Sequence, residues 1–423
     1  MKNPLELIGE SFPQSRQAQI LLGSIVGVSV VLDQPQIALA SVFVAMGARA
    51  WLNWRNNDLV EECVPAYTET AKTHADDYGI IAMMDGYGMM GAKLIDVMPG
   101  AVLNRYIIQL PPGTQSKDLP NTDDMAMALG VRSVVINPAN KRMCKELDLP
   151  APTRQVVDFD ALLDSQEWAI AKASFMRLPV CPAVTVDGKP YIIDLADGVH
   201  YFIAGTTGAG KSVFANALML SLMDSGRKFT LLVGDGKYNK GDFYPYYSKS
   251  EHLLNSYRDM VEGEPECKGM AIEPEEMASQ FEYLVWAMEE RLKGNQDATP
   301  LIYLMDEMKD VVDMLSASDD KNALKAFIRN VGRLAQKARS VNITILFCTQ
   351  SPNSEWLPQT LRAVIPSAFG MMVSSGAQSR VCIGENGCEK LLGKGDAIAK
   401  INGTTTRIHG ANVTKRHLLE LVK

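Results

Sequence analysis

Short apolar runs alternate with longer amphipathic segments over the carboxy-terminal half of the chain. Three of these runs, at 200–204, 301–305 and 343–349, are mostly apolar and are followed by polar or glycine residues. Such runs are typical of strands buried on both faces of a parallel sheet, and the segments between them are long enough for helices. From residue 199 onward the pattern therefore predicts an α/β fold, with a parallel sheet and crossover helices.

A second, shorter pattern lies upstream. Alternating segments at 91–98, 102–110 and 132–138 predict strands, and the segment 123–130 predicts a helix between them. Together they indicate a small α/β unit. The stretch that links this unit to the larger pattern, residues 153–195, reads as a connector with a helix and a hairpin, because its Asp-Gly dipeptide favours a tight turn.

Two apolar runs near the amino terminus, at 17–32 and 37–48, contain no charged residue. Each is a little short for a span of about 20 residues, but a tight polar turn joins them, and the pair predicts a transmembrane helical hairpin. Basic residues flank its outer ends: Lys2, Arg16, Arg49 and Arg55. Their position predicts an inner-membrane hairpin with both termini in the cytoplasm. The alternative is a buried helical hairpin that packs on another subunit.

Composition limits the class of protein. The chain has 423 residues, 47% of them hydrophobic and 22% charged, which is typical of a folded chain with two or three domains. Its net charge of −7 lacks the basic footprint of most nucleic-acid binders, so DNA binding would depend on a few residues lining a channel. The seven cysteines include no Cys-x-x-Cys pair and predict reduced thiols, and the scattered histidines predict no zinc site.

The most specific motif is YFIAGTTGAGKSV, which fits GxxxxGK[ST] between a predicted strand and a predicted helix. Glycines let backbone N–H groups turn toward phosphates, and the amino terminus of the helix favours their negative charge. Lys211 would reach the β- and γ-phosphates of ATP, and Ser212 would bind Mg²⁺. A chance glycine-rich turn is the alternative, and the flanking elements argue against it. The predicted nucleotide-binding residues are Gly205, Thr206, Thr207, Gly208, Ala209, Gly210, Lys211, Ser212 and Val213.

Polar residues end two of the other predicted strands. Asp306 follows the apolar run 301–305 and would hold Mg²⁺ as a Walker B aspartate, while Glu307 would act as general base toward the attacking water. A carboxylate pair at a strand end is otherwise a helix cap, but the upstream phosphate loop favours catalysis. Gln350 ends the run 343–349 and is a candidate for a residue that senses the γ-phosphate.

Several motifs, in order, resemble those of the FtsK/SpoIIIE family of double-stranded DNA translocases, over about residues 79–423. The motor motifs are AGTTGAGKSV (204–213), LLVGDGK (231–237), WAMEERLK (286–293), RLAQKARSVNITILFCTQSP (333–352), IPSAFGMMVSSGAQSR (365–380) and CEKLLGKGDA (388–397). The segments VMPGAVLNRYIIQLPPG and ALGVRSVVI resemble the small domain that precedes the motor in this family.

The resemblance implies a RecA-like P-loop ATPase that works as a homo-oligomer, a hexameric ring around double-stranded DNA. It also implies that Arg339 is an arginine finger for the neighbouring subunit, with Arg333 as second candidate; for each, a surface salt bridge is the plain alternative. The predicted domains are an amino-terminal membrane hairpin (1–56), a linker with the small α/β domain (57–152) and the ATPase motor (153–423).

Some positions depart from the family pattern. Residues of other types stand where the family has Arg, Lys or Asp: Ser351, Ala368, Met372, Gly376 and Gln378. Lys390 and Lys394 remain as candidate phosphate contacts, although an exposed lysine is ordinarily just solvated. No winged-helix segment follows the last motif, so sequence-directed movement is not expected.

The leading interpretation is ATP-driven translocation of double-stranded DNA at a membrane, with conjugative or mobile-element transfer as a fold-level analogy. One alternative is a protein-secretion ATPase of the type VII kind, although those usually join several motor domains. The other is a scaffold that binds nucleotide without turnover, against which the intact Lys211, Asp306 and Glu307 argue.

Overall fold

The structure is a computed structural model. It describes residues 78–422 except for 199, 238–240, 256–262, 295–298, 321, 351, 354–361, 363, 364 and 366. The chain divides into two compact units, Met1–His74 and Ala75–Lys423, and the described residues belong to the second. The predicted hairpin at 1–56 and the start of the predicted linker lie outside the described residues. Of the helices that the structure does describe, none has the length and apolar character needed to cross a membrane.

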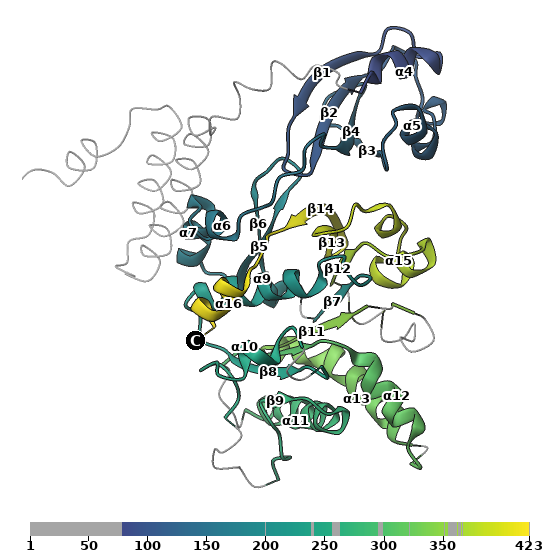
Figure 1. Ribbon diagram of the computed structural model, residues 1–423. Coiled ribbons are helices and arrows are strands. Elements are labelled where there is room, and N and C mark those ends of the chain that lie inside the picture. Colours follow the sequence, from purple (N-terminus) through teal and green to yellow (C-terminus); the bar gives the residue numbers. More distant parts are fainter. Residues whose placement is uncertain are drawn as a thin grey trace, which may run out of the picture. The chain divides into compact units, whose positions relative to one another are not determined.

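The small α/β unit is an antiparallel four-stranded sheet in the order β1-β2-β4-β3, with helices α4 and α5 (Figure 1). The two helices share one apolar core with the sheet. The elements are α4 (Ile80–Gly86), β1 (Lys93–Met98), β2 (Leu103–Gln109), a 3-10 turn (Ser116–Asp118), α5 (Thr122–Ala128), β3 (Val135–Pro138) and β4 (Cys144–Pro150). The three predicted strands and the predicted helix of this unit are present, within a few residues of the expected bounds.

Strand β4 is an addition that the sequence pattern did not predict. Arg105 of β2 lies opposite Asp148 of β4, and its Nε donates to Asp148 Oδ1 at 2.7 Å. The Asp148 side chain is only 1% exposed, so this cross-strand ion pair is part of the packed sheet. The charged residues of this segment are typical of a polar loop, so the hydrophobic pattern did not indicate a strand here.

The larger sheet has ten strands among the described residues, in the order β6-β5-β14-β13-β12-β7-β11-β10-β8-β9. The block from β12 to β9 is parallel, and the four strands on the other side pair antiparallel. The strands are β5 (Pro179–Thr185), β6 (Pro190–Asp194), β7 (His200–Ala204), β8 (Thr230–Gly234), β9 (Met270–Ala271), β10 (Leu301–Met305), β11 (Ile343–Thr349), β12 (Ser367–Met371), β13 (Asp396–Ile401) and β14 (Thr404–Gly410).

Helices cover both faces of this sheet (Figure 1). In β10, Ile302 and Leu304 join the core under α9, while Tyr303 and its neighbours of the same parity join the core under α11, α12 and α13. This alternation follows from the two-residue repeat of a strand, and it explains why the run is apolar throughout. The helices and remaining turns are α6 (Phe159–Leu163), α7 (Gln166–Ala173), α8 (Leu195–Gly198), α9 (Lys211–Asp224), α10 (Tyr244–Tyr247), α11 (Pro274–Leu292), α12 (Met308–Ala317), α13 (Ala323–Lys337), a 3-10 turn (Ala338–Val341), α15 (Gly376–Ile383), a 3-10 turn (Cys388–Lys390) and α16 (Lys415–Leu421).

The observed architecture therefore matches the predicted α/β class with a large, mostly parallel sheet. Two details differ from the prediction. The hairpin placed in a connector is present as β5 and β6, with Gly188 at φ 79° in its turn, but it extends the large sheet. The last two strands, β13 and β14, pair antiparallel rather than parallel. The small sheet ends at Pro150 and the large sheet begins at Pro179. The domain boundaries expected at residues 56 and 152 stay predictions.

A buried histidine joins a helix to the sheet. His200 begins β7 and is fully buried; its Nδ1 accepts the backbone N–H of Ile345, and its Nε2 lies 3.2 Å from the carbonyl oxygen of Leu334. Both contacts together fix a neutral ring that donates through Nε2. Burial lowers the pKa of His200 to about 4.

Candidate functional site

The predicted phosphate loop, residues 205–210, connects β7 to α9, so it lies at the carboxyl edge of the parallel strands. Gly208 and Gly210 have φ values of 80° and 105°, which only glycine adopts readily. A side chain at Gly210 would also meet the backbone nitrogen of Gly395 at 2.8 Å. Lys211, Ser212 and Val213 then form the first turn of α9, as the motif predicts.

Backbone contacts hold this loop between the two neighbouring strands. The N–H of Gly205 donates to the carbonyl of Thr349 at the end of β11, at 3.1 Å. The N–H and the hydroxyl of Thr206 both donate to the carbonyl of Met372, just after β12, at 2.9 and 3.0 Å. These contacts tie the loop to the ends of β11 and β12, and the N–H of Ala209 also donates to the carbonyl of Thr206 within the loop, at 3.0 Å.

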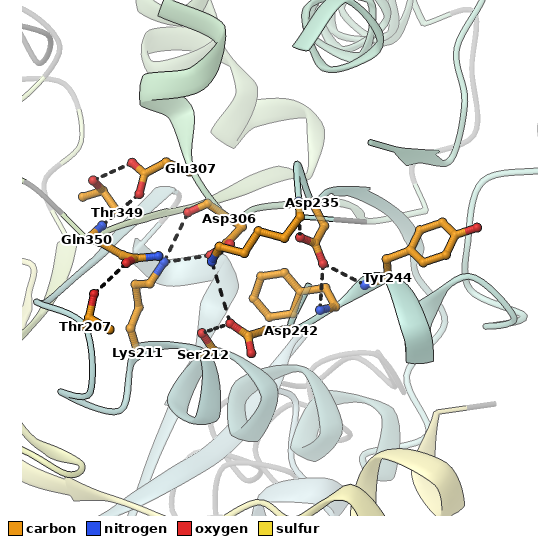
Figure 2. A network of polar contacts seen from close by, with 12 residues as sticks. Thr207, Lys211, Ser212, Asp235, Asp242, Tyr244, Asp306, Glu307, Thr349 and Gln350 are labelled. Carbon is orange, nitrogen blue, oxygen red and sulfur yellow. Dashed lines mark hydrogen bonds and ion pairs between the residues drawn. The ribbon is translucent and has the colours of Figure 1, made fainter. Parts of the chain in front are cut away.

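The side chains of Lys211 and Asp306 meet beside the phosphate loop (Figure 2). Lys211 Nζ lies 2.7 Å from Asp306 Oδ1, and the two side chains are 5% and 1% exposed. A second lysine, Lys237, which follows β8, reaches Asp306 Oδ2 at 2.6 Å. Burial alone would raise the pKa of Asp306, but the two ammonium groups outweigh it, and the pKa of this carboxyl lies below its usual value. Asp306 therefore stays ionised although it is buried.

Glu307 follows Asp306 and faces the end of β11. Thr349 Oγ1 donates to Glu307 Oε1 at 2.8 Å, and the backbone N–H of Gln350 donates to Oε2 at 3.0 Å. Burial and, less strongly, the charge of Asp306 raise the pKa of Glu307 above its ordinary value, although the two hydrogen bonds oppose the shift. Gln350 Oε1 also accepts a hydrogen bond from Thr207 Oγ1 at 2.9 Å, so β11 is linked to the phosphate loop.

The strand order explains how residues far apart in sequence converge. Strand β11 lies between β7 and β10, so the polar residues at its end stand between the phosphate loop and the two carboxylates. The structure thus brings together Lys211, Ser212, Asp306, Glu307 and Gln350, which were all predicted from the sequence. It also adds Lys237, Thr349 and Asp242, which were not among the predicted site residues.

Asp242 carries no local motif. Ser212 Oγ donates to Asp242 Oδ2 at 2.5 Å, and Figure 2 shows Asp242 directly over the first turn of α9. In the sequence it is one polar residue in a tyrosine-rich stretch, so only the fold could reveal it.

Arg339, the predicted arginine finger, does not lie at this site in the same chain. It is an exposed residue of the 3-10 turn that precedes β11, at the amino edge of the strands. The seven residues of β11 separate that edge from the nucleotide site by roughly 20 Å at about 3.3 Å per residue. Arg333, the second candidate, forms an ion pair with Glu289 on the neighbouring helix α11.

The two candidate phosphate-contact lysines have different surroundings. Lys390 Nζ lies 2.7 Å from Asp123 Oδ1 in the first turn of α5, so it already has an acidic partner in the small α/β unit. Lys394 has a φ of 50°, and its neighbour Gly395 donates its N–H to the carbonyl of Ala209 in the phosphate loop at 2.9 Å. Lys394 is therefore far from the phosphate loop in sequence but close to it in space.

The chain is similar to known proteins in its sequence. A family model described as the FtsK/SpoIIIE family matches residues 161–293. The DNA translocase FtsK of Borreliella burgdorferi is 29% identical over 351 residues, which are 79% of this chain and 42% of that protein. The DNA translocase FtsK of Pseudomonas syringae pv. syringae is 31% identical over 356 residues, 77% of this chain and 43% of that protein. The chain thus spans less than half the length of these two relatives.

A solved structure supports the fold. The conjugation coupling protein TcpA of pCW3, in a monomer form with ATPγS, aligns with a TM-score of 0.51 over 82% of this chain and 99% of that chain. Only 16% of the aligned residues are identical, so the likeness concerns the arrangement of helices and strands.

Proposed function

Because the chain carries a domain of the FtsK/SpoIIIE family, a family of P-loop ATPases, we propose that it is an ATP-driven motor that translocates double-stranded DNA. One observation carries the proposal above the others: Lys211, Asp306 and Glu307 lie together at the carboxyl edge of the parallel strands. A scaffold that only bound nucleotide would have no need for the positioned Glu307.

The residues divide the chemistry among them. Backbone N–H groups of the phosphate loop and the amino terminus of α9 would bind the phosphates of ATP. The Lys211 ammonium group would then leave its ion pair with Asp306 and bind phosphate oxygens instead. Ser212 and Asp306 offer the hydroxyl and carboxylate oxygens that Mg²⁺ prefers. Mg²⁺ neutralises charge on the β- and γ-phosphates when it is bound.

That metal would depend on the nucleotide for part of its coordination. Among the described residues, no group of three or more His, Cys, Asp or Glu side chains could hold a metal ion. Mg²⁺ is commonly held by one or two carboxylates together with substrate phosphates, which agrees with so sparse a donor set.

Glu307 would take a proton from the attacking water. Its carboxylate is fixed at both oxygens by Thr349 and Gln350, and its raised pKa brings it closer to that of a useful general base. When the γ-phosphate leaves, the contacts of Gln350 would change, and this change would shift the end of β11. This contact is a route by which hydrolysis could move the sheet edge against DNA.

We propose a ring in which Arg339 serves the neighbouring subunit. Its exposure and its place at the opposite sheet edge suit action in trans rather than in its own chain. Arg339→Ala should lose turnover while it keeps nucleotide binding. Mixing Arg339→Ala with Lys211→Ala chains should restore part of the activity, because some interfaces then pair an intact site with an intact finger. If mixing restores nothing, the trans assignment fails.

We also propose that residues 17–52 anchor the chain at the inner membrane, with the motor in the cytoplasm. The two uncharged runs and their basic flanks support this. The full chain should sediment with membranes and require detergent, and a chain lacking residues 1–55 should stay in the supernatant with its ATPase activity. Full-length protein that is soluble without detergent would overturn the anchor.

The decisive test of the motor is ATP turnover with and without random-sequence duplex DNA, at low and moderate salt. Stimulation should rise with duplex length and fall as salt increases, because phosphate contacts release counterions and carry no sequence information. Lys211→Ala, which loses the phosphate-binding charge, is the matched inactive control. Turnover that no duplex stimulates would contradict DNA translocation and favour a protein-secretion ATPase; no turnover at all would favour a scaffold.

A further inference from the structure

A carboxylate outside the predicted motifs contacts the predicted metal ligand of the phosphate loop. The Ser212 hydroxyl donates a hydrogen bond to Asp242 Oδ2 at 2.5 Å, which is a short, charge-assisted contact. In Figure 2 the Asp242 carboxylate points toward Ser212. Its side chain is 46% exposed, so solvent and a hydrated ion have access to it.

Asp306 does not supply this contact. Lys211 occupies its Oδ1 at 2.7 Å and Lys237 its Oδ2 at 2.6 Å. Asp242 is therefore the carboxylate that holds the Ser212 hydroxyl, while Asp306 is engaged with the two lysines.

The position of Asp242 is fixed by the fold. Asp235, at the end of β8, is fully buried, and its Oδ2 accepts the backbone N–H groups of Phe243 and Tyr244 at 2.9 Å each. Gly241 packs so closely on the same carboxylate that a Cβ would lie 2.0 Å from its oxygen. These contacts pin the backbone on both sides of Asp242 and aim its side chain at α9.

A positive group already lies beside both carboxylates. Lys237 Nζ is 2.6 Å from Asp306 Oδ2 and 3.9 Å from Asp242 Oδ2. The negative charges of Asp306 and Asp242 thus attract the Lys237 ammonium group to a place near Ser212. A divalent ion held by Ser212 and Asp306 would experience the charge of Asp242 as well.

From this geometry we propose that Asp242 is the outer carboxylate of the Mg²⁺ site. Its carboxylate accepts a hydrogen bond from the Ser212 hydroxyl, so that the lone pairs of the hydroxyl oxygen face the ion. It also adds one negative charge near the water molecules that surround the ion. The inference rests on the proposed ATPase function. Groups that orient a metal ligand in this way typically contribute 10- to 100-fold in metal affinity.

The test measures Mg²⁺ directly, without turnover. Full-length chain with Glu307→Gln, which should bind but not hydrolyse ATP, is saturated with a fluorescent ATP analogue, and Mg²⁺ is titrated. Asp242→Ala should raise the half-saturating Mg²⁺ concentration about 10- to 100-fold. Asp242→Asn keeps an acceptor oxygen but loses the charge, so it should give a smaller rise. Glu251→Gln, an exposed carboxyl a few residues downstream, is the matched control and should give none.

A double-mutant cycle then asks whether Asp242 acts through Ser212. In a Ser212→Ala background, adding Asp242→Ala should raise the Mg²⁺ midpoint by clearly less than it does when Ser212 is present, because the shared contact is already lost and only the charge of Asp242 remains to be removed. An unchanged midpoint in Asp242→Ala, or an equal shift in both backgrounds, would overturn the inference. Circular dichroism and nucleotide affinity without Mg²⁺ report on folding. A parent chain that binds no nucleotide would instead refute the ATPase proposal.

Discussion

The buried carboxylate of Asp235 organises the loop beside the nucleotide site, and its replacement by Asn tests that role. Its oxygens accept three backbone N–H groups: those of Phe243 and Tyr244 at 2.9 Å, and that of Lys237 at 3.2 Å. Asn is nearly the same size, but it has no charge and only one acceptor oxygen. If that oxygen serves Phe243 and Tyr244, its amide group faces the N–H of Lys237 as a second donor.

The size of the effect follows from these three bonds. A hydrogen bond to a charged group contributes about 1.5–3 kcal/mol and a neutral one about 0.5–1.5 kcal/mol, so each of the two stronger bonds weakens by roughly 1 kcal/mol. The unsatisfied donor at Lys237 costs about 1–2 kcal/mol more, for a local total of about 3–4 kcal/mol. At 1.4 kcal/mol per tenfold change, the loop should open roughly 100-fold more often, or still more.

Hydrogen exchange followed by mass spectrometry measures this opening. A peptide that covers 241–247 should exchange faster in Asp235→Asn, while peptides from β2 and β4 of the small sheet serve as internal references. Asp313→Asn is the control, because that exposed aspartate forms a surface ion pair with Lys309 on α12 and its replacement should change little. Unchanged exchange at 241–247 in Asp235→Asn would show that the loop does not depend on this carboxylate.

Three further results are expected. Glu307→Gln should raise the melting temperature at pH 7, because burial raises the pKa of Glu307 and so penalises its charged form; the gain should vanish as the pH falls below the ordinary glutamate pKa. The parent chain should lose stability as the pH falls from about 6.5 to about 4, because His200 is held neutral with a pKa of about 4, and His200→Gln should flatten that loss in thermal melts. Lys390→Ala should leave the melting temperature within about two degrees, since its ion pair with Asp123 is exposed; a larger drop would show that the contact is structural.

The parts that sequence could predict are those encoded within a few neighbouring residues. The phosphate loop needs glycines, a lysine and a serine at fixed spacing, and its structure follows from them. Asp306, Glu307 and Gln350 were found because each ends an apolar run, and parallel strands bring their carboxyl ends to one edge. Local pattern and global fold agree at these positions.

Other parts depend on contacts between distant segments, which one sequence does not display. Strand β4 contains Lys145, Glu146 and Asp148, and Arg105 of β2 forms ion pairs with both of these carboxylates. Likewise, the side chain of Asp242 faces Ser212 because the buried Asp235 binds the backbone next to Asp242, at Phe243. No composition or spacing rule predicts either arrangement.

Lys390 and Lys394 show how distance in sequence can mislead about mechanism. Both are candidate contacts to DNA phosphates, and each lies far from Lys211 and Asp306 in the sequence. Yet the N–H of Gly395 donates to the carbonyl of Ala209, in the middle of the phosphate loop. A change at Lys394, whose positive φ already constrains its backbone, would therefore act on nucleotide binding as well.

Lys390 begins the same short segment and is paired with Asp123 of the small α/β unit. The segment 390–395 thus touches the small unit at one end and the phosphate loop at the other. A combined replacement of both lysines would mix a change of the inter-unit contact with a change of the nucleotide site. Only separate variants, each measured for nucleotide affinity and for turnover with duplex DNA, can distinguish a DNA contact from a structural connection between the two.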